Sequence, residues 1–245
     1  MESVKEKQDR KKLGIIGGMG PLATAELFRL IVENTASTSD QGHIRIFIDN
    51  NPGIPDRTQA VLYGGEDPVP EMIRSARALE SLGADYLLMP CNTAHYFIDR
   101  IQAGVGVPFI NMVEQTALYL SSSGIRKAGL LCTTGTLRGG VYSGYLTREG
   151  IELLTPDDEG QQDVMDLIYR GVKAGNASFD ASRFQRVADR LYESGAEVLI
   201  LGCTELLPGI RMYGVSVGRV TEPMLVLARS AVRKAGYETV PAPEL

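Results

Sequence analysis

The sequence predicts an α/β protein of two similar lobes, each a parallel sheet flanked by helices, related by pseudo-twofold symmetry about a cleft. Short apolar runs alternate with segments of helical periodicity along the chain. Residues 83–93 and 195–205 share one pattern, namely Gly-Ala-acid, an apolar run, and a cysteine followed by small polar residues. Residues 12–20 and 127–135 form a second similar pair. The cysteines are 112 residues apart and the second pair 115, so the two offsets indicate one internal duplication.

The composition of the 245-residue chain is that of a globular protein, with 44% hydrophobic residues. Its net charge of −5 leaves no basic surface for nucleic acid, and no uncharged run reaches the roughly 18 residues of a membrane span. Three cysteines, an odd number, disfavour a disulfide framework and favour reduced thiols in the cytoplasm. Residues 1–12 form a charged run without an apolar core, so we expect a disordered lead-in and no secretory signal.

The first strand is predicted at residues 13–16, followed by a glycine-rich turn and a helix at 22–35. Glycines let the backbone approach a ligand closely, and a helix N-terminus favours an anion. Gly18, Gly20 and Ala23 fit the G-x-G-x-x-A fingerprint of dinucleotide binding. A nicotinamide-dependent dehydrogenase is therefore one alternative.

The next strand, predicted at 44–48, ends at Asp49, which lies later than the ribose-binding acid of that fingerprint. The loop at 49–58 is rich in turn-forming residues, and Arg57 is its one cation. Arg57 is either a solvated surface arginine or a guanidinium fork for a carboxylate. Its place beyond the carboxyl end of a strand favours the second interpretation.

A helix is predicted at 70–82, and the apolar strand before Cys91 follows it. His95 lies four residues after Cys91, early in a helix predicted at 93–102. Cys-x-x-x-His can ligate a metal, but the only other histidine is His43 and no acid cluster accompanies it, so we expect no metal site. His95 is either a partner of Cys91 or a buried, hydrogen-bonded histidine.

The remaining chain continues the alternation of strands and helices. Strands are predicted at 107–110, from 127, at 151–154 and at 215–217, and helices at 112–120, 162–173, 183–194 and 222–235. We expect residues 13–113 and 219–245 to form the first lobe, which carries Cys91, and residues 114–218 to form the second lobe, which carries Cys203. Lys173, at the exit of its helix, also has an ordinary explanation as a cation near a helix C-terminus.

Cys91 and Cys203 at equivalent strand ends are the central candidates. One alone would be an ordinary buried cysteine, but two that are each followed by polar residues indicate a function, because ligands bind at the carboxyl ends of parallel strands. A thiol near a helix N-terminus has a lowered pKa. One thiolate and one thiol on opposite faces of a carbon can remove and deliver a proton and so invert that carbon. Candidate donors to a substrate carboxylate are Asn92, Thr93, Thr134, Thr136 and Thr204.

Four motifs are specific in combination. They are Gly17-Gly18-Met19-Gly20-Pro21, Ile54-Pro55-Asp56-Arg57-Thr58, Pro90-Cys91-Asn92-Thr93-Ala94-His95 and Gly202-Cys203-Thr204-Glu205. Together they resemble the aspartate/glutamate racemase family, on its aspartate racemase branch. The similarity covers residues 13–235.

The resemblance implies a cofactor-independent racemase that forms a homodimer, takes a small amino acid as substrate, and has its active site in the cleft. It implies Cys91 and Cys203 as the acid–base pair, with Arg57 and Lys173 holding the substrate's distal carboxylate. Gly139 and Arg219 depart from the family pattern, in which serine and aspartate are more usual. The other expected substrate contacts are Met19, Gly20, Asn50, Asn92, Thr93, Thr134, Gly135, Thr136 and Thr204, with His95 and Glu205 in support.

The expected reaction is the interconversion of L- and D-aspartate by two-base proton transfer at Cα. Alternatives within the fold are a broad-specificity amino-acid racemase, a glutamate racemase, a hydantoin racemase and a maleate isomerase. Alternatives of another class are the dehydrogenase and a non-catalytic amino-acid sensor. A sensor needs neither cysteine, so the presence of both argues against it.

Overall fold

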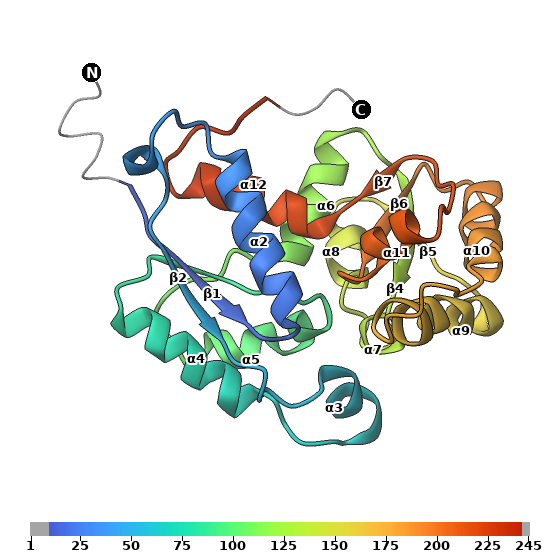
Figure 1. The fold of residues 1–245 in the computed structure, drawn as a ribbon, viewed down its shortest axis with the longest axis horizontal. Coiled ribbons are helices and arrows are strands. Elements are labelled where there is room, and N and C mark those ends of the chain that lie inside the picture. The colour runs from blue at the N-terminus through green and yellow to red at the C-terminus, as the bar shows by residue number, and fades with distance from the viewer. Residues whose placement is uncertain (1–9, 242–245) are drawn as a thin grey trace.

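The computed structural model describes residues 10–241 and contains two parallel sheets, one in each lobe (Figure 1). The first has the strand order β2-β1-β3 and the second β5-β4-β6-β7, so β1 and β4 hold equivalent central places. This equivalence confirms the α/β fold of two similar lobes. The strands are β1 (Leu13–Gly17), β2 (Ile46–Asn50), β3 (Tyr86–Leu88), β4 (Lys127–Cys132), β5 (Glu152–Leu154), β6 (Val198–Gly202) and β7 (Val220–Thr221).

Helices cover both faces of the first sheet. Successive residues of a strand point to opposite faces, so neighbouring residues of β1 pack against different helices. Ile15 belongs to a core cluster with residues of α2 and α12, and Ile16 to a cluster with residues of α4 and α5. The helical segments around this sheet are α2 (Pro21–Asn34), η1 (Asp40–Gly42), α3 (Arg57–Tyr63), α4 (Val69–Ser81), η2 (Thr93–Phe97), α5 (Ile98–Gln102) and α12 (Pro223–Lys234).

The second sheet is covered in the same way. Leu131 lies in a cluster with residues of α9 and α10, and Leu130 in a cluster with residues of α6 and α8. The helical segments here are α6 (Met112–Ser122), α7 (Thr134–Arg138), α8 (Ser143–Arg148), α9 (Asp158–Asp166), the π-helix η3 (Leu167–Val172), α10 (Ser182–Glu193) and α11 (Leu206–Met212).

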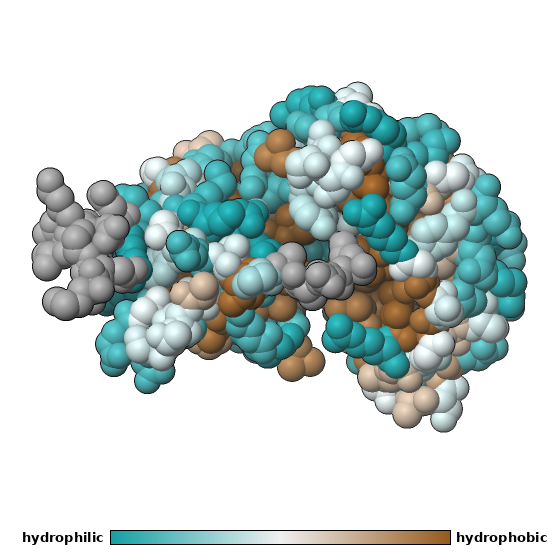
Figure 2. Space-filling view, turned by 90° about the horizontal axis from the view of Figure 1, so that it is seen from above, coloured by the Kyte–Doolittle hydropathy of each residue, from teal (hydrophilic) through white to brown (hydrophobic). Residues whose placement is uncertain are grey.

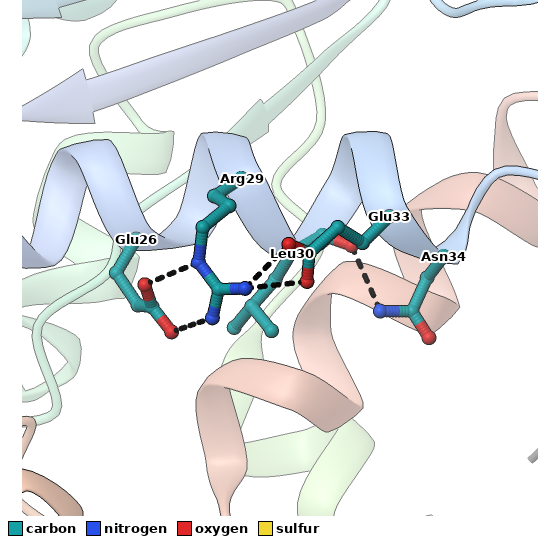
Figure 3. A network of polar contacts seen from close by, with 5 residues as sticks. All are labelled: Glu26, Arg29, Leu30, Glu33 and Asn34. Atoms are coloured by element: carbon teal, nitrogen blue, oxygen red, sulfur yellow. Dashed lines mark hydrogen bonds and ion pairs between the residues drawn. The ribbon is translucent and has the colours of Figure 1, made fainter. Parts of the chain in front are cut away.

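The outer face of α2 carries a small ion-pair network (Figure 3). Arg29 lies between Glu26 and Glu33, with N···O distances of 2.6 and 2.5 Å. The Asn34 amide nitrogen donates to the Leu30 carbonyl at 2.8 Å. Exposed pairs of this kind contribute only about 0.3–0.5 kcal/mol each, so burial of the opposite face holds α2 in place.

Two predicted strands differ from the structure. Residues 107–110 form only a bridge, between Leu87 and Phe109. The strand predicted at 215–217 is wrong, because Gln185 engages both backbone groups of Ser216 with its side chain, at 2.8 and 2.6 Å. The last strand is β7, which pairs with β6 a few residues later.

The first and last described segments both belong to the first lobe. The Lys11 N–H donates to the Ala235 carbonyl at 3.0 Å, and Leu227 of α12 is fully buried in the cluster that contains Leu13. The expected disorder at residues 1–9 lies outside the described residues, and the lobe boundaries near 113 and 219 stay predictions. Within residues 10–241, none of the helices has both the length and the apolar character of a membrane span. Hydrophilic residues cover most of the face in Figure 2, and apolar residues show in a hollow on the half that carries the second lobe.

Candidate active site

A small recess opens between the lobes beyond the carboxyl ends of β3 and β6, and both Cys91 and Cys203 line it. Cys91 lies three residues after the end of β3, and Cys203 directly follows β6. The walls come from both halves of the chain. They comprise Met19, Asp56, Arg57, Thr58, Cys91, Asn92 and Thr93 from the first and Thr133, Tyr169, Lys173, Gly202, Cys203, Thr204 and Glu205 from the second.

Most of the residues expected at the site from the sequence line this recess, but six do not. Thr134 lines a neighbouring groove, and Thr136 reaches the site only indirectly, through hydrogen bonds of 2.8 Å to Thr93 and 3.1 Å to Thr133. Gly135 packs against Thr58 so closely that a Cβ there would lie 2.8 Å from the Thr58 hydroxyl oxygen. The others outside the lining are Gly20, Asn50 and His95.

Five lining residues were not expected. Thr133 directly follows β4, so the strand-end argument could have found it. Tyr169 lies in η3 and gives no signal in the sequence. The remaining three are Asp56, Thr58 and Gly202.

Arg57 is held by backbone carbonyls. Its Nη1 donates to the carbonyls of Ile54 and Pro55 at 3.0 and 2.9 Å, and Nη2 to that of Met19 at 3.4 Å. Its buried Nε has no hydrogen-bond partner among the described residues, and no carboxylate of this part of the chain forms an ion pair with it. A fixed guanidinium whose charge is not neutralised by the protein suits an anionic ligand.

The turn before α2 braces the loop that carries Arg57. Gly18 has a φ of 91°, and a Cβ there would lie 2.2 Å from the Asn51 backbone. Its N–H donates to the Thr24 hydroxyl at 2.9 Å. Gly18, one of the two glycines that fit a dinucleotide fingerprint, thus serves a close approach of two protein segments.

Glu205 is the centre of the polar contacts around Cys203. The Cys203 Sγ donates to Glu205 Oε2 at 3.0 Å, and the Thr204 hydroxyl donates to the same oxygen at 2.9 Å. Burial, followed by the Glu205 carboxylate, raises the pKa of the Cys203 thiol well above its usual value. The expectation of a lowered pKa is therefore wrong for Cys203, because burial and an adjacent anion outweigh the helix that follows.

Lys173 balances the charge of Glu205. Its Nζ lies 3.4 Å from Glu205 Oε1 and 4.8 Å from the centre of the Tyr169 ring. Burial raises the pKa of Glu205, but Lys173 and the hydrogen bonds from Cys203 and Thr204 outweigh it, so the net pKa is lowered. Burial lowers the pKa of Lys173, but Glu205 and Tyr169 outweigh it, so the net pKa is raised. Both members of the pair are charged near neutral pH.

The two residues after Cys91 are held by the second lobe. The Tyr142 O–H donates to Asn92 Oδ1 at 2.5 Å. The Thr93 hydroxyl lies 3.1 Å from that of Thr133 and 2.8 Å from that of Thr136. Hydroxyls both donate and accept, so the three threonines form a closed contact across the cleft.

His95 contacts backbone and not the thiol of Cys91. Its Nδ1 donates to the Cys91 carbonyl at 2.8 Å, and its Nε2 accepts from the Met112 N–H at 3.2 Å. Burial lowers the pKa of His95 from 6.5 to about 4. His95 is thus a neutral, hydrogen-bonded histidine that holds the Cys91 turn against α6. Between residues 10 and 241, no group of three or more His, Cys, Asp or Glu residues could hold a metal ion.

Known proteins of the same architecture are named as racemases. The sequence model of the "Asp/Glu/Hydantoin racemase" family matches residues 16–231. The structure of Picrophilus torridus aspartate racemase superimposes with a TM-score of 0.80 at 32% identity, over 94% of this chain and 96% of that one. An aspartate racemase homologue from Pyrococcus horikoshii gives 0.74 at 27% identity, over 92% and 99%. The broad-specificity amino-acid racemase RacX of Bacillus subtilis is 26% identical over 79% of this chain and 85% of its own.

The match of this family model to most of the chain identifies the protein as a racemase, a kind of isomerase. The chain belongs to the Asp/Glu/hydantoin racemase family, and it is an amino-acid racemase of that family. The dehydrogenase and sensor alternatives are set aside by this membership.

Proposed function

We propose that this enzyme interconverts L- and D-aspartate by moving the Cα proton between Cys91 and Cys203. The observation that carries the proposal is that both cysteines line one recess, each beyond a strand of a different lobe. A thiolate on one side removes the Cα proton, and a thiol on the other side delivers a proton to the opposite face. The return reaction uses the same pair with the protonation states exchanged.

The raised pKa of Cys203 indicates which of the two cysteines carries the proton in the free enzyme. Cys203 is a thiol near neutral pH, so it is the proton donor of the first turnover. Cys91 then acts as the base, and the family resemblance pairs Cys91 with the D enantiomer and Cys203 with the L enantiomer. Each turnover reverses the two roles.

Two kinds of donor in the recess support a dicarboxylic substrate. Arg57 has an uncompensated charge and takes the distal carboxylate, with Lys173 as the second cation of the recess. The polar side chains that follow the two cysteines, Asn92, Thr93 and Thr204, supply neutral donors to the α-carboxylate. Hydrogen bonds in which one partner is charged contribute about 1.5–3 kcal/mol each, so these contacts set the preference.

A second candidate is an amino-acid racemase of broad specificity, the activity that the name of the Bacillus subtilis relative prints. A wider groove shares Asp56, Thr58 and Tyr169 with the recess and leaves room for longer side chains. Lys173 already forms an ion pair with Glu205, so it is less available to bind a second substrate carboxylate.

The test is to incubate single enantiomers of several amino acids in D2O and follow optical rotation and Cα deuterium uptake by NMR. Aspartate should react fastest, and Cys91→Ser and Cys203→Ser should each lose racemisation by orders of magnitude, because a hydroxyl does not ionise near neutral pH. Each variant should retain Cα exchange of one enantiomer only. Cys132→Ala is the matched control, since Cys132 is buried outside the recess. Full racemisation by either serine variant would refute the two-base mechanism.

Three further expectations stay predictions: independence of cofactors, the homodimer and the cytoplasmic location. Activity should survive dialysis against EDTA and treatment with hydroxylamine. Activity that is lost on dialysis and restored by zinc would contradict the first expectation.

A further inference from the structure

We propose that Tyr142 is a positioning residue that fixes the orientation of the Asn92 amide, so that its NH2 group faces the recess and binds a substrate carboxylate. The inference rests on the proposed function, because that function supplies the carboxylate. Nothing in the sequence motif around Asn92 points to a tyrosine 50 positions away.

Tyr142 is fully buried, and its phenol O–H donates to Asn92 Oδ1 at 2.5 Å. The two residues come from different lobes, since Tyr142 precedes α8 and Asn92 follows β3. Asn92 is 5% exposed and lines the recess, and its Nδ2 makes no hydrogen bond to another described residue. The side chain therefore has one satisfied end, which faces Tyr142, and one end with unused donors.

An asparagine amide has an acceptor end and a donor end of nearly the same shape, so its surroundings must select the orientation. A rotation by 180° would place the Oδ1 acceptor at the recess, where it would repel a carboxylate. The Tyr142 proton opposes this, because the rotated amide would turn an N–H donor towards it and leave the buried phenol only its contact with the Thr116 side chain. The loss of one such hydrogen bond costs about 0.5–1.5 kcal/mol.

The same turn receives a second fixed contact from the second lobe. Thr93, next to Asn92, is hydrogen-bonded to Thr133 and Thr136. The second lobe thus contributes more than Cys203 to the chemistry: it also orients the donors that follow Cys91.

Tyr142→Phe tests the inference by removing only the hydroxyl. One net hydrogen bond is about 0.5–1.5 kcal/mol, so we expect KM for aspartate to rise about 3- to 10-fold with a smaller change in kcat. Tyr145→Phe is the matched control, because Tyr145 lies in the same segment and its phenol oxygen accepts from Asn111 at 2.8 Å, outside the recess. Both variants should unfold at lower temperature, but only Tyr142→Phe should change KM.

A double-mutant cycle separates positioning from general structural damage. In an Asn92→Ala background, Tyr142→Phe should cause no further loss of kcat/KM, because the amide that it orients is absent. Independent losses that add, or an unchanged KM in Tyr142→Phe, would overturn the inference.

Succinate binding measured by calorimetry gives a readout that needs no turnover. It should weaken in Tyr142→Phe and stay unchanged in Tyr145→Phe, and equal binding by the two variants would count against the inference. If the two variants bind succinate as expected but the wild-type enzyme exchanges no Cα proton of any amino acid, the proposed function is refuted and the inference about Tyr142 stands.

Discussion

Arg57 illustrates how much of the selectivity can reside in one side chain. It is the one cation of the recess, among the described residues, without a carboxylate partner. Arg57→Ala should lower kcat/KM for aspartate about 10- to 150-fold, the equivalent of 1.5–3 kcal/mol, because a charge-assisted contact is lost. Arg57→Lys keeps the charge and should lose less. Steady-state kinetics with both enantiomers measures this, and a wild-type kcat/KM in the alanine variant would refute the assignment.

Glu205 should control the pH at which Cys203 ionises. Its carboxylate, after burial, raises the pKa of Cys203, so Glu205→Gln should lower that pKa while it keeps an acceptor for the thiol. Racemisation has an equilibrium constant of one at every pH, so the pH profile of kcat/KM is the same for both enantiomers. In Glu205→Gln the limbs of this shared profile should move to lower pH.

Initial rates of each enantiomer across the pH range check this prediction. Glu33→Gln, on the solvent face of α2 in Figure 3, removes the same charge far from the recess and should leave both limbs in place. Limbs that coincide with those of the wild type in Glu205→Gln would show that Glu205 does not set the ionisation of Cys203.

The sequence predicted part of the site and not the rest, for a physical reason. Cys91, Cys203 and Arg57 follow strands, and strand ends in a parallel sheet meet at one edge, so their meeting could be predicted. Tyr169, in η3, and Tyr142, in the turn before α8, reach the site by tertiary packing, which leaves no local signal. The lowered pKa expected for Cys203 was wrong because its burial, and then its contact with Glu205, are set by the fold.

At the scale of elements, the long amphipathic helices and the buried strands were predictable and the short helices were not. α3, α7, α8 and α11 have five to seven residues, which is too short for a helical period to show. The apolar alternation at 215–217 looked like a strand, but Gln185 satisfies the backbone there.

The turn between β1 and α2 should be intolerant of side chains. Gly18→Ala would place a left-handed φ on a residue with a Cβ, and that Cβ would lie 2.2 Å from the Asn51 backbone. We expect the loop that carries Arg57 to shift. The free energy of unfolding should fall by about 1–3 kcal/mol, and most activity should be lost. Gly144→Ala in α8, where a Cβ meets nothing within 4 Å, is the control and should be neutral or stabilising. Thermal unfolding and aspartate kinetics measure both, and a Gly18→Ala enzyme like the wild type would contradict the packing argument.

At the scale of the whole molecule, the stability should fall in acid through His95. Its pKa is about 4 when folded and 6.5 otherwise, so between these values the unfolded chain binds more protons than the folded chain. The contribution of His95 to the free energy of unfolding is therefore fully present above about pH 6.5. It decreases by about 3 kcal/mol as the pH falls towards about 4. His95→Gln should show a lower stability at pH 7 but a flatter dependence on pH. Urea unfolding at several pH values measures this, and equal slopes in the two proteins would contradict it.

The internal duplication explains why the two-lobed fold could be predicted from the sequence, although individual tertiary contacts could not. Two copies of one strand–helix pattern constrain each other, and both sheets have the same order around their central strands β1 and β4. The return of α12 to the first lobe depends instead on packing of Leu227 against Leu13, a contact between the two ends of the chain.

The two halves are nevertheless unequal where they meet the substrate. Cys203 is followed by Thr204 and the ion-paired Glu205, whereas the equivalent positions after Cys91 are Asn92 and Thr93. Mirror-image amino acids have the same free energy in water, so the equilibrium constant of racemisation is unity and the two values of kcat/KM must be equal. If the contacts of Glu205 give one enantiomer a lower KM than the other, that enantiomer must therefore also have the lower kcat. The asymmetry of the lobes can set how fast each enantiomer is consumed at saturation, but it cannot enrich either one.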